Sequence, residues 1–295
     1  MLLYKVIVGP FLFILSILPL KTIRVLGRLL GQILFFISNR HRNITLTNLK
    51  LAFPELPDKE IKSLCKKSLI ETGTTLLESG YVWIRLPGNS LPQSIQVEGF
   101  ENVSQSLQDG CGILLFTPHQ ANIEILINFL GQNLDCSVPY SKIKNEYLDD
   151  FVKKARAKMG VNMVEVNITG VKKLLNNLSK GETVAIASDQ VPELSGGEIS
   201  KFFGQECLSM SLLWKLQNKT KAKVHSMVCI RGPKGNDFKL IFGPQLEMPH
   251  TIKEGVDTMN KELEKCIMLA PEQYAWEYKK YRRAGNEDHY NKRIL

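Results

Sequence analysis

Residues 113–130, which read ILLFTPHQANIEILINFL, constrain the fold more than any other stretch of the chain. Residues 113–116 form an apolar run of the length of a buried strand, and Thr117-Pro118 interrupts it. From Ile123 onward, apolar residues recur with the spacing of an amphipathic helix. We therefore predict that a buried strand gives way to a helix near His119. In open α/β sheets ligands bind beyond the carboxyl ends of the strands, so His119 would lie where such sites form.

Strand-like and helix-like segments alternate through the rest of the sequence. Strands are expected at residues 95–97, 113–116, 138–140, 163–166, 184–187 and 224–230, and helices at 103–107, 147–159, 171–178, 212–217 and 252–269. This alternation predicts an α/β fold with a mainly parallel central sheet flanked by helices. The chain has 295 residues, 44% of them hydrophobic, which is enough to bury such a core.

The N-terminal region is expected to bind a membrane. Residues 6–20 carry no charge, but they are shorter than the roughly 20 residues that span a bilayer comfortably. Lys21, Arg24 and Arg28 then mark a basic stripe on a helix whose other face is apolar. We predict an N-terminal membrane-anchoring helical segment over residues 1–42, either spanning or interfacial, and a single domain over 43–295 on the cytoplasmic side. A core helix of a soluble protein is the alternative.

The formal net charge of +9 indicates an anionic partner, such as a phospholipid surface, a phosphorylated lipid, an acidic protein or nucleic acid. No recognised nucleic-acid module accompanies the basic residues, so nucleic acid is not expected. The six cysteines are scattered without a CxxC pair, which is typical of reduced thiols in the cytosol. The other four histidines have no ligand-like spacing to His119, and we expect neither a metal nor a cofactor.

His119 and Glu124 are candidates for a catalytic pair. They are five positions apart, so within one continuous helix they would diverge by about 140°. They can meet only if His119 precedes the helix and folds back. A carboxylate that accepts the proton of one ring nitrogen would fix the tautomer and raise the basicity of the other nitrogen, as a general base requires. A structural histidine also fits this short pattern.

The run GCGILLFTPHQANIE resembles the His-x4-Asp/Glu block of the bacterial lipid A secondary acyltransferases, which are lysophospholipid acyltransferase-like lauroyl and myristoyl transferases of the inner membrane. Further blocks are similar and follow in the family's order: NLKLAFPEL, VPYSKIKN, ARAKMG, SDQVP, KFFGQ and PEQYAWEYKKYRR. The family more often has glycine and an aromatic residue where Ala121 and Ile123 stand. The resemblance covers nearly the whole chain.

The resemblance implies a membrane-associated O-acyltransferase at the bacterial inner membrane, with its catalytic domain facing the cytoplasm. His119, oriented by Glu124, would deprotonate a hydroxyl of a lipid A precursor or another phosphorylated glycolipid. The alkoxide would attack a fatty acyl thioester carried by acyl carrier protein. Arg156 is implied as a contact of the acceptor's phosphate. Asp189 and Gln190 follow the strand-like run 184–187, again at a carboxyl edge, where they could hydrogen-bond the sugar or the acyl carbonyl or could simply form a turn or helix cap.

Three other functions remain open. The acceptor could be another membrane lipid or glycolipid, water could hydrolyse the thioester, or the protein could be a non-catalytic membrane scaffold that binds a carrier protein. Residues 194–204, LSGGEISKFFG, could form a mobile lid over an acyl channel or a structural loop with a buried phenylalanine pair. The aromatic and basic residues within 274–283 are interpreted as a surface for a lipid headgroup or an acidic carrier protein.

Overall fold

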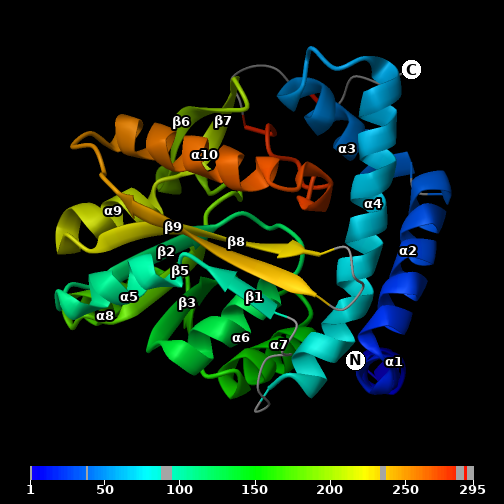
Figure 1. Ribbon diagram of the computed structural model, residues 1–295, viewed down its shortest axis with the longest axis horizontal. Coiled ribbons are helices and arrows are strands. Elements are labelled where there is room, and N and C mark those ends of the chain that lie inside the picture. The colour runs from blue at the N-terminus through cyan, green and yellow to red at the C-terminus, as the bar shows by residue number, and fades with distance from the viewer. Residues whose placement is uncertain (1, 38, 88–94, 233–236, 284–288, 291–295) are drawn as a thin grey trace.

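The computed structural model describes residues 2–37, 39–87, 95–232, 237–283 and 289–290 (Figure 1). It confirms the predicted α/β fold with a mostly parallel central sheet. All neighbouring strands pair in parallel except β8 and β9, which are antiparallel. In order across the sheet the strands are β1 (Ile95–Glu98), β9 (Phe238–Leu246), β8 (Lys223–Arg231), β2 (Ile113–Thr117), β5 (Thr183–Ala187), β3 (Cys136–Tyr140) and β4 (Asn162–Glu165).

Helices cover both faces of this sheet, because its central strands are apolar on both sides. On β2, Ile113 and Leu115 point into one layer and Leu114 and Phe116 into the other, and all four are completely buried. The first layer holds α5 (Phe100–Gln108), α6 (Ile123–Asn133) and α7 (Glu146–Lys158), and the second holds α8 (Ile168–Ser179), α9 (Leu212–Thr220) and α10 (Ile252–Met268).

The expected strands and helices after residue 95 are all present, within a few residues of their predicted ends. Three further strands were not predicted: β9 and the two strands of an antiparallel hairpin, β6 (Gly197–Phe202) and β7 (Gln205–Met210). The hairpin occupies the segment for which a mobile lid was one interpretation. Phe202 is fully buried there and packs edge-on against Phe203, with ring centroids 5.0 Å apart. The segment is therefore a β-hairpin instead of a loop, and Phe202 is buried while Phe203 is partly exposed.

Four N-terminal helices lie along one side of the molecule, drawn in blue and cyan in Figure 1. They are α1 (Leu2–Ile17), α2 (Leu20–Ile37), α3 (Asn39–Ala52) and α4 (Asp58–Gly80), which continues into a π-helical turn, Tyr81–Arg85. Helices α2 and α4 approach so closely that a Cβ atom at Gly31 would lie 2.3 Å from Cα of Ile70. None of the helices in the described ranges is both long and apolar enough to cross a bilayer.

One residue of the predicted basic stripe, Arg24, is buried instead of exposed. Lys21 and Arg28 are exposed, but Arg24 is 1% exposed and its guanidinium donates to Glu78 of α4. A buried arginine needs a paired carboxylate, and Glu78 is 54 positions away in sequence. The interpretation of Arg24 as a surface cation is therefore wrong.

Candidate active site

The pairing of β2 with β5 brings two of the predicted site residues together. These parallel neighbours are in register with Thr117 opposite Ala187. His119 and Asp189 each lie two residues beyond that pair, at the carboxyl edge of the sheet. The expectation that a histidine follows the buried strand at this edge is confirmed.

Both carboxylate oxygens of Asp189 form hydrogen bonds with His119. The ring Nδ1 lies 2.6 Å from Oδ1, and the backbone N–H of His119 donates to Oδ2 at 3.0 Å. Since a carboxylate only accepts, Nδ1 carries the proton and Nε2 of the neutral ring keeps its lone pair. The side-chain amide nitrogen of Gln190 lies 3.4 Å from Nε2. Asp189 and Gln190 were expected to contact substrate, whereas here Asp189 orients the histidine.

This pairing controls both ionisation equilibria. Burial alone would lower the pKa of His119, but the charge and hydrogen bond of Asp189 outweigh it and the net pKa is raised above 6.5. Burial would likewise raise the pKa of Asp189, but the hydrogen bonds and charge of His119, with Lys280 nearby, lower it overall. The imidazolium form is thus stabilised beside a carboxylate that stays ionised.

Glu124 is paired with Arg156 and makes no hydrogen bond to His119. Its carboxylate accepts from Nε of Arg156 at 3.0 Å and from Nη2 at 2.6 Å, a bidentate arrangement. The predicted orientation of His119 by Glu124 is therefore wrong as a contact, and Glu124 acts on the ring only through its charge, as one of the smaller influences on its pKa. Asn122 explains the geometry, because its side chain caps α6 by accepting from the backbone N–H of Glu124.

The side chain of Arg156 is largely buried, with only 19% of it exposed. Burial alone would lower its pKa, and the charge and hydrogen bonds of Glu124 raise it overall. Arg156 lies in the last turn of α7 and Glu124 in the first turn of α6, so the pair joins two helix ends beside the histidine. The site thus contains two adjacent charge pairs instead of one.

The C-terminal segment contacts the site through Lys280. Lys280 is 2% exposed, and its ammonium donates to the backbone carbonyl of Asp189 at 2.9 Å. Tyr274 and Trp276 are also buried, with their rings packed edge-on. The interpretation of these residues as part of an exposed binding surface is therefore wrong.

A cavity of about 870 Å³ opens beside His119. Its wall includes His119, Gln190 and Arg156, and apolar side chains make up much of the remainder, among them Leu126, Leu130 and Met227. Lys153, Lys215 and Lys219 also line it. A cavity of this size and character accommodates a mostly apolar ligand with a few charged groups. Within the described ranges, no three histidine, cysteine, aspartate or glutamate side chains gather closely enough to hold a metal ion.

The chain is similar to known proteins along most of its length. The family model described as "Bacterial lipid A biosynthesis acyltransferase" matches residues 3–283. The chain is similar to the lipid A biosynthesis lauroyltransferase of Escherichia coli strain K12, with 28% identity over 90% of this chain and 87% of that protein. It is 24% identical to the palmitoleoyltransferase of the same strain over 90% of this chain and 86% of that protein. It is also 24% identical to a lipid A biosynthesis acyltransferase of Haemophilus influenzae, over 90% of this chain and 84% of that protein.

Proposed function

Because the chain belongs to the bacterial lipid A biosynthesis acyltransferase family, we propose that it moves a fatty acyl group from acyl carrier protein to a hydroxyl of a lipid A precursor, with His119 as the general base. The observation that carries this proposal is the 2.6 Å contact between Nδ1 of His119 and the carboxylate of Asp189. Nδ1 is held by a buried carboxylate and His119 lines the cavity, so Nε2 is proposed to accept the proton of a substrate hydroxyl that displaces the amide of Gln190.

The reaction then needs no covalent enzyme intermediate. The acceptor hydroxyl gives its proton to Nε2 of His119, and its oxygen forms a bond to the carbonyl carbon of the thioester. The C–S bond breaks as the tetrahedral intermediate collapses, and the departing thiolate takes the proton back from the imidazolium. Asp189 stabilises the imidazolium between these two transfers, since its carboxylate stays ionised beside the ring.

The surroundings of His119 suit both substrates. The apolar walls at Leu126 and Leu130 would accommodate acyl chains away from water. Arg156 borders the same cavity, with Nε and Nη2 held by Glu124, and is proposed to bind the acceptor's phosphate through the rest of its guanidinium. Gln190 would donate its amide hydrogens to the sugar or the acyl carbonyl.

Membrane association is proposed through the outer face of α1 and α2. Large apolar side chains project there into solvent, with Phe13 59%, Phe36 68% and Ile37 75% exposed. Lys21 and Arg28 lie on the same two-helix unit and would attract anionic headgroups. An exposed apolar face of this extent needs a partner, and a lipid surface provides one without crossing of the bilayer. This arrangement would keep the catalytic domain on the cytoplasmic side of the inner membrane.

The carrier protein is proposed to approach the cavity along its lysines. Lys215 and Lys219 on α9 are exposed at the cavity wall, and the whole chain carries a net charge of +9. An acidic carrier protein would gain encounter rate and orientation from such a surface.

The test is a transfer assay with His119→Ala. Purified protein is incubated with labelled acyl carrier thioester and a lipid A precursor, and the labelled lipid and free acid are separated. The wild type should form labelled lipid, and His119→Ala should be about 10²–10⁴-fold slower. Exclusive release of free acid would indicate a thioesterase, transfer only to other lipids would reassign the acceptor, and no turnover by the wild type would indicate a scaffold.

A further inference from the structure

The turn between His119 and Glu124 has an unfavourable backbone conformation. Ala121 has a φ angle of 49°, in the left-handed region where a residue with a Cβ atom is strained. Two contacts hold it there: its backbone N–H donates to the carbonyl of Gln273 at 2.8 Å, and its carbonyl accepts from Oγ1 of Thr75 at 3.0 Å. Such a conformation persists only where its surroundings fix it.

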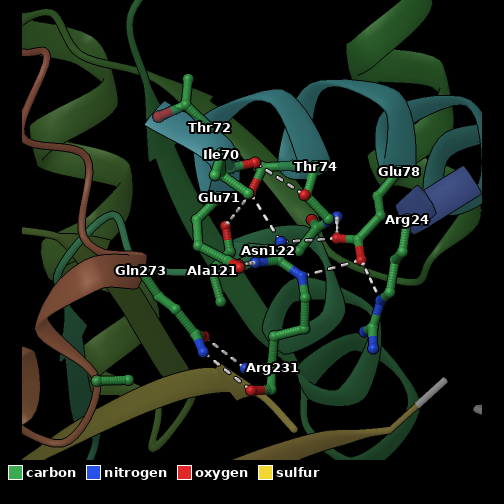
Figure 2. Close-up of polar contacts among 12 residues, drawn as sticks. Arg24, Ile70, Glu71, Thr72, Thr74, Glu78, Ala121, Asn122, Arg231 and Gln273 are labelled. Atoms are coloured by element: carbon green, nitrogen blue, oxygen red, sulfur yellow. Dashed lines mark hydrogen bonds and ion pairs between the residues drawn. The ribbon is translucent and has the colours of Figure 1, made fainter. Parts of the chain in front are cut away.

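The next residue, Asn122, also contacts α4, the helix that carries Thr75. Asn122 donates its side-chain Nδ2 to Oε2 of Glu78 at 3.1 Å, while its Oδ1 caps α6 at the backbone N–H of Glu124. Figure 2 shows Glu78 on α4, pointing toward Asn122 and toward the side chains of Arg24 and Arg231. Burial would raise the pKa of Glu78, but the two arginines lower it, so it is an ionised acceptor.

All three anchors of the turn contact one residue, Arg231, at the end of β8. Its Nη2 donates to Oγ1 of Thr75 at 2.7 Å and to Oε2 of Glu78 at 2.8 Å. Its backbone N–H and carbonyl pair with the side-chain amide of Gln273 at 2.6 and 2.9 Å (Figure 2). Nη1 pairs with Glu71, which completes a network that draws on three distant parts of the chain.

We infer that Arg231, acting through Thr75, Glu78 and Gln273, is a positioning residue that fixes the strained turn and so sets His119 relative to Glu124. This inference rests on the proposed function, because it assigns the geometry of the same base. Arg231 does not line the cavity and its side chain is 3% exposed, so it acts without touching substrate.

We expect the network to affect the rate of catalysis as well as the stability of the fold. The base must meet the acceptor hydroxyl while Arg156 holds the same molecule, and those two side chains are fixed through opposite ends of the turn. A displacement of about 1 Å in such an arrangement can cost about 100-fold in rate. A second carboxylate on Arg231 and a second arginine on Glu78 balance the buried charges, so the network can hold the turn without an unpaired ion.

Thr75→Val tests this with an isosteric change. It removes the hydroxyl that links Arg231 to the carbonyl of Ala121. We expect kcat to fall about 10- to 100-fold while KM for the acyl carrier thioester and for the lipid A precursor stays near the wild-type value. Thr75→Ser should restore most of kcat, because it keeps the hydroxyl.

The matched control is Thr74→Val on the same helix. Thr74 is 1% exposed, whereas Thr75 is partly exposed, and the hydroxyl of Thr74 donates to the carbonyl of Ile70 one turn earlier, as Figure 2 shows. Thr74→Val should keep wild-type kcat with a melting temperature similar to that of Thr75→Val. Equal kcat in the two valine variants, or failure of Thr75→Ser to recover activity, would overturn the inference.

Two further variants keep the outcome decisive. If Thr75→Val does not fold, Asn122→Ser replaces it: serine can still cap α6 at Glu124 but loses the donor to Glu78, so the same loss in kcat is expected. Wild-type kcat in a folded Asn122→Ser would then overturn the inference.

His119→Ala is measured alongside these variants. Transfer at the wild-type rate by His119→Ala would reject the base itself, whereas an inactive His119→Ala with a fully active Thr75→Val would reject only the positioning role.

Discussion

Asp189→Asn is the substitution for which the structure makes the sharpest prediction. Both carboxylate oxygens of Asp189 accept hydrogen bonds from His119, one from the ring and one from the backbone N–H. An amide has only one oxygen. If that oxygen faces the ring, the amide NH₂ opposes the backbone N–H. If it faces the backbone, the NH₂ faces Nδ1 and forces the proton onto Nε2, where the ring can no longer accept one.

Either arrangement removes most of the catalytic advantage of the base. A comparable exchange in serine proteases, which imposes the wrong histidine tautomer, lowers kcat about 10⁴-fold. We expect Asp189→Asn to reduce kcat by about 10³–10⁴-fold with little change in substrate affinity. The size of the residue is preserved and Lys280 still has the backbone carbonyl of residue 189, so the fold should survive.

The pH dependence of the transfer rate distinguishes the role of Asp189 from that of Glu124. Transfer requires the neutral ring, so wild-type activity should fall as pH decreases through the pKa of His119, which lies above 6.5. Asp189 is the main influence that raises this pKa, so Asp189→Asn should move the acidic limb to lower pH. Glu124→Gln removes only a smaller through-space influence and should move the limb less, while turnover falls because Arg156 loses its partner.

The measurement is the initial rate of labelled acyl transfer between about pH 5 and pH 9, with thermal denaturation of each variant as the control for folding. Near-normal kcat in Asp189→Asn would refute the assignment of the ring's orientation. A larger shift of the acidic limb in Glu124→Gln than in Asp189→Asn would restore the His119–Glu124 pair as the functional unit.

Three further predictions concern other parts of the molecule. Gly31→Ala should destabilise the fold by about 1–3 kcal/mol in thermal or chemical denaturation, because the new Cβ would meet the backbone of Ile70 at 2.3 Å; wild-type stability would contradict the close packing of α2 on α4. Phe36→Ser should lower partitioning onto anionic phospholipid vesicles by about 10- to 100-fold in a sedimentation assay, since a buried phenylalanine side chain contributes about 1.5–3 kcal/mol; unchanged binding would exclude this face from the membrane contact. Arg156→Ala should raise KM for the phosphorylated acceptor and cost about 1–3 kcal/mol of stability because Glu124 loses its partner, while Arg156→Lys recovers part of the binding; equal losses with dephosphorylated acceptor would remove the phosphate role.

The sequence was sufficient where the signal was local. Apolar runs of four or five residues located the buried strands, and the Thr117-Pro118 break located the edge at which His119 lies. Strand β9 escaped prediction because Gly243-Pro244 interrupts its alternating pattern. The hairpin at residues 197–210 was missed for a similar reason, since a glycine pair before two aromatics is compatible with a loop as well as with a strand.

The sequence was insufficient where a contact depends on register or on distant pairing. Asp189 lies 70 positions from His119, and only the alignment of Thr117 with Ala187 reveals that the two meet. The burial of Arg24 depends on Glu78 in another helix, which no periodicity within α2 could show. Removal of residues 1–42 would consequently strip a buried arginine and a tightly packed helix from the core, so it is a poor test of membrane anchoring.

The His-x4-Glu spacing does not place the two residues in one hydrogen-bonded pair; each of them belongs to a separate pair. His119 is fixed to Asp189 before the turn, and Glu124 begins a helix that faces Arg156 after it. One member of each pair, His119 and Arg156, lines the same cavity, and the intervening turn includes Ala121 in a left-handed conformation. Glycine adopts that conformation without strain. Ala121→Gly should therefore be tolerated in activity, whereas a β-branched residue such as valine, which is more strained there, should disturb both pairs together.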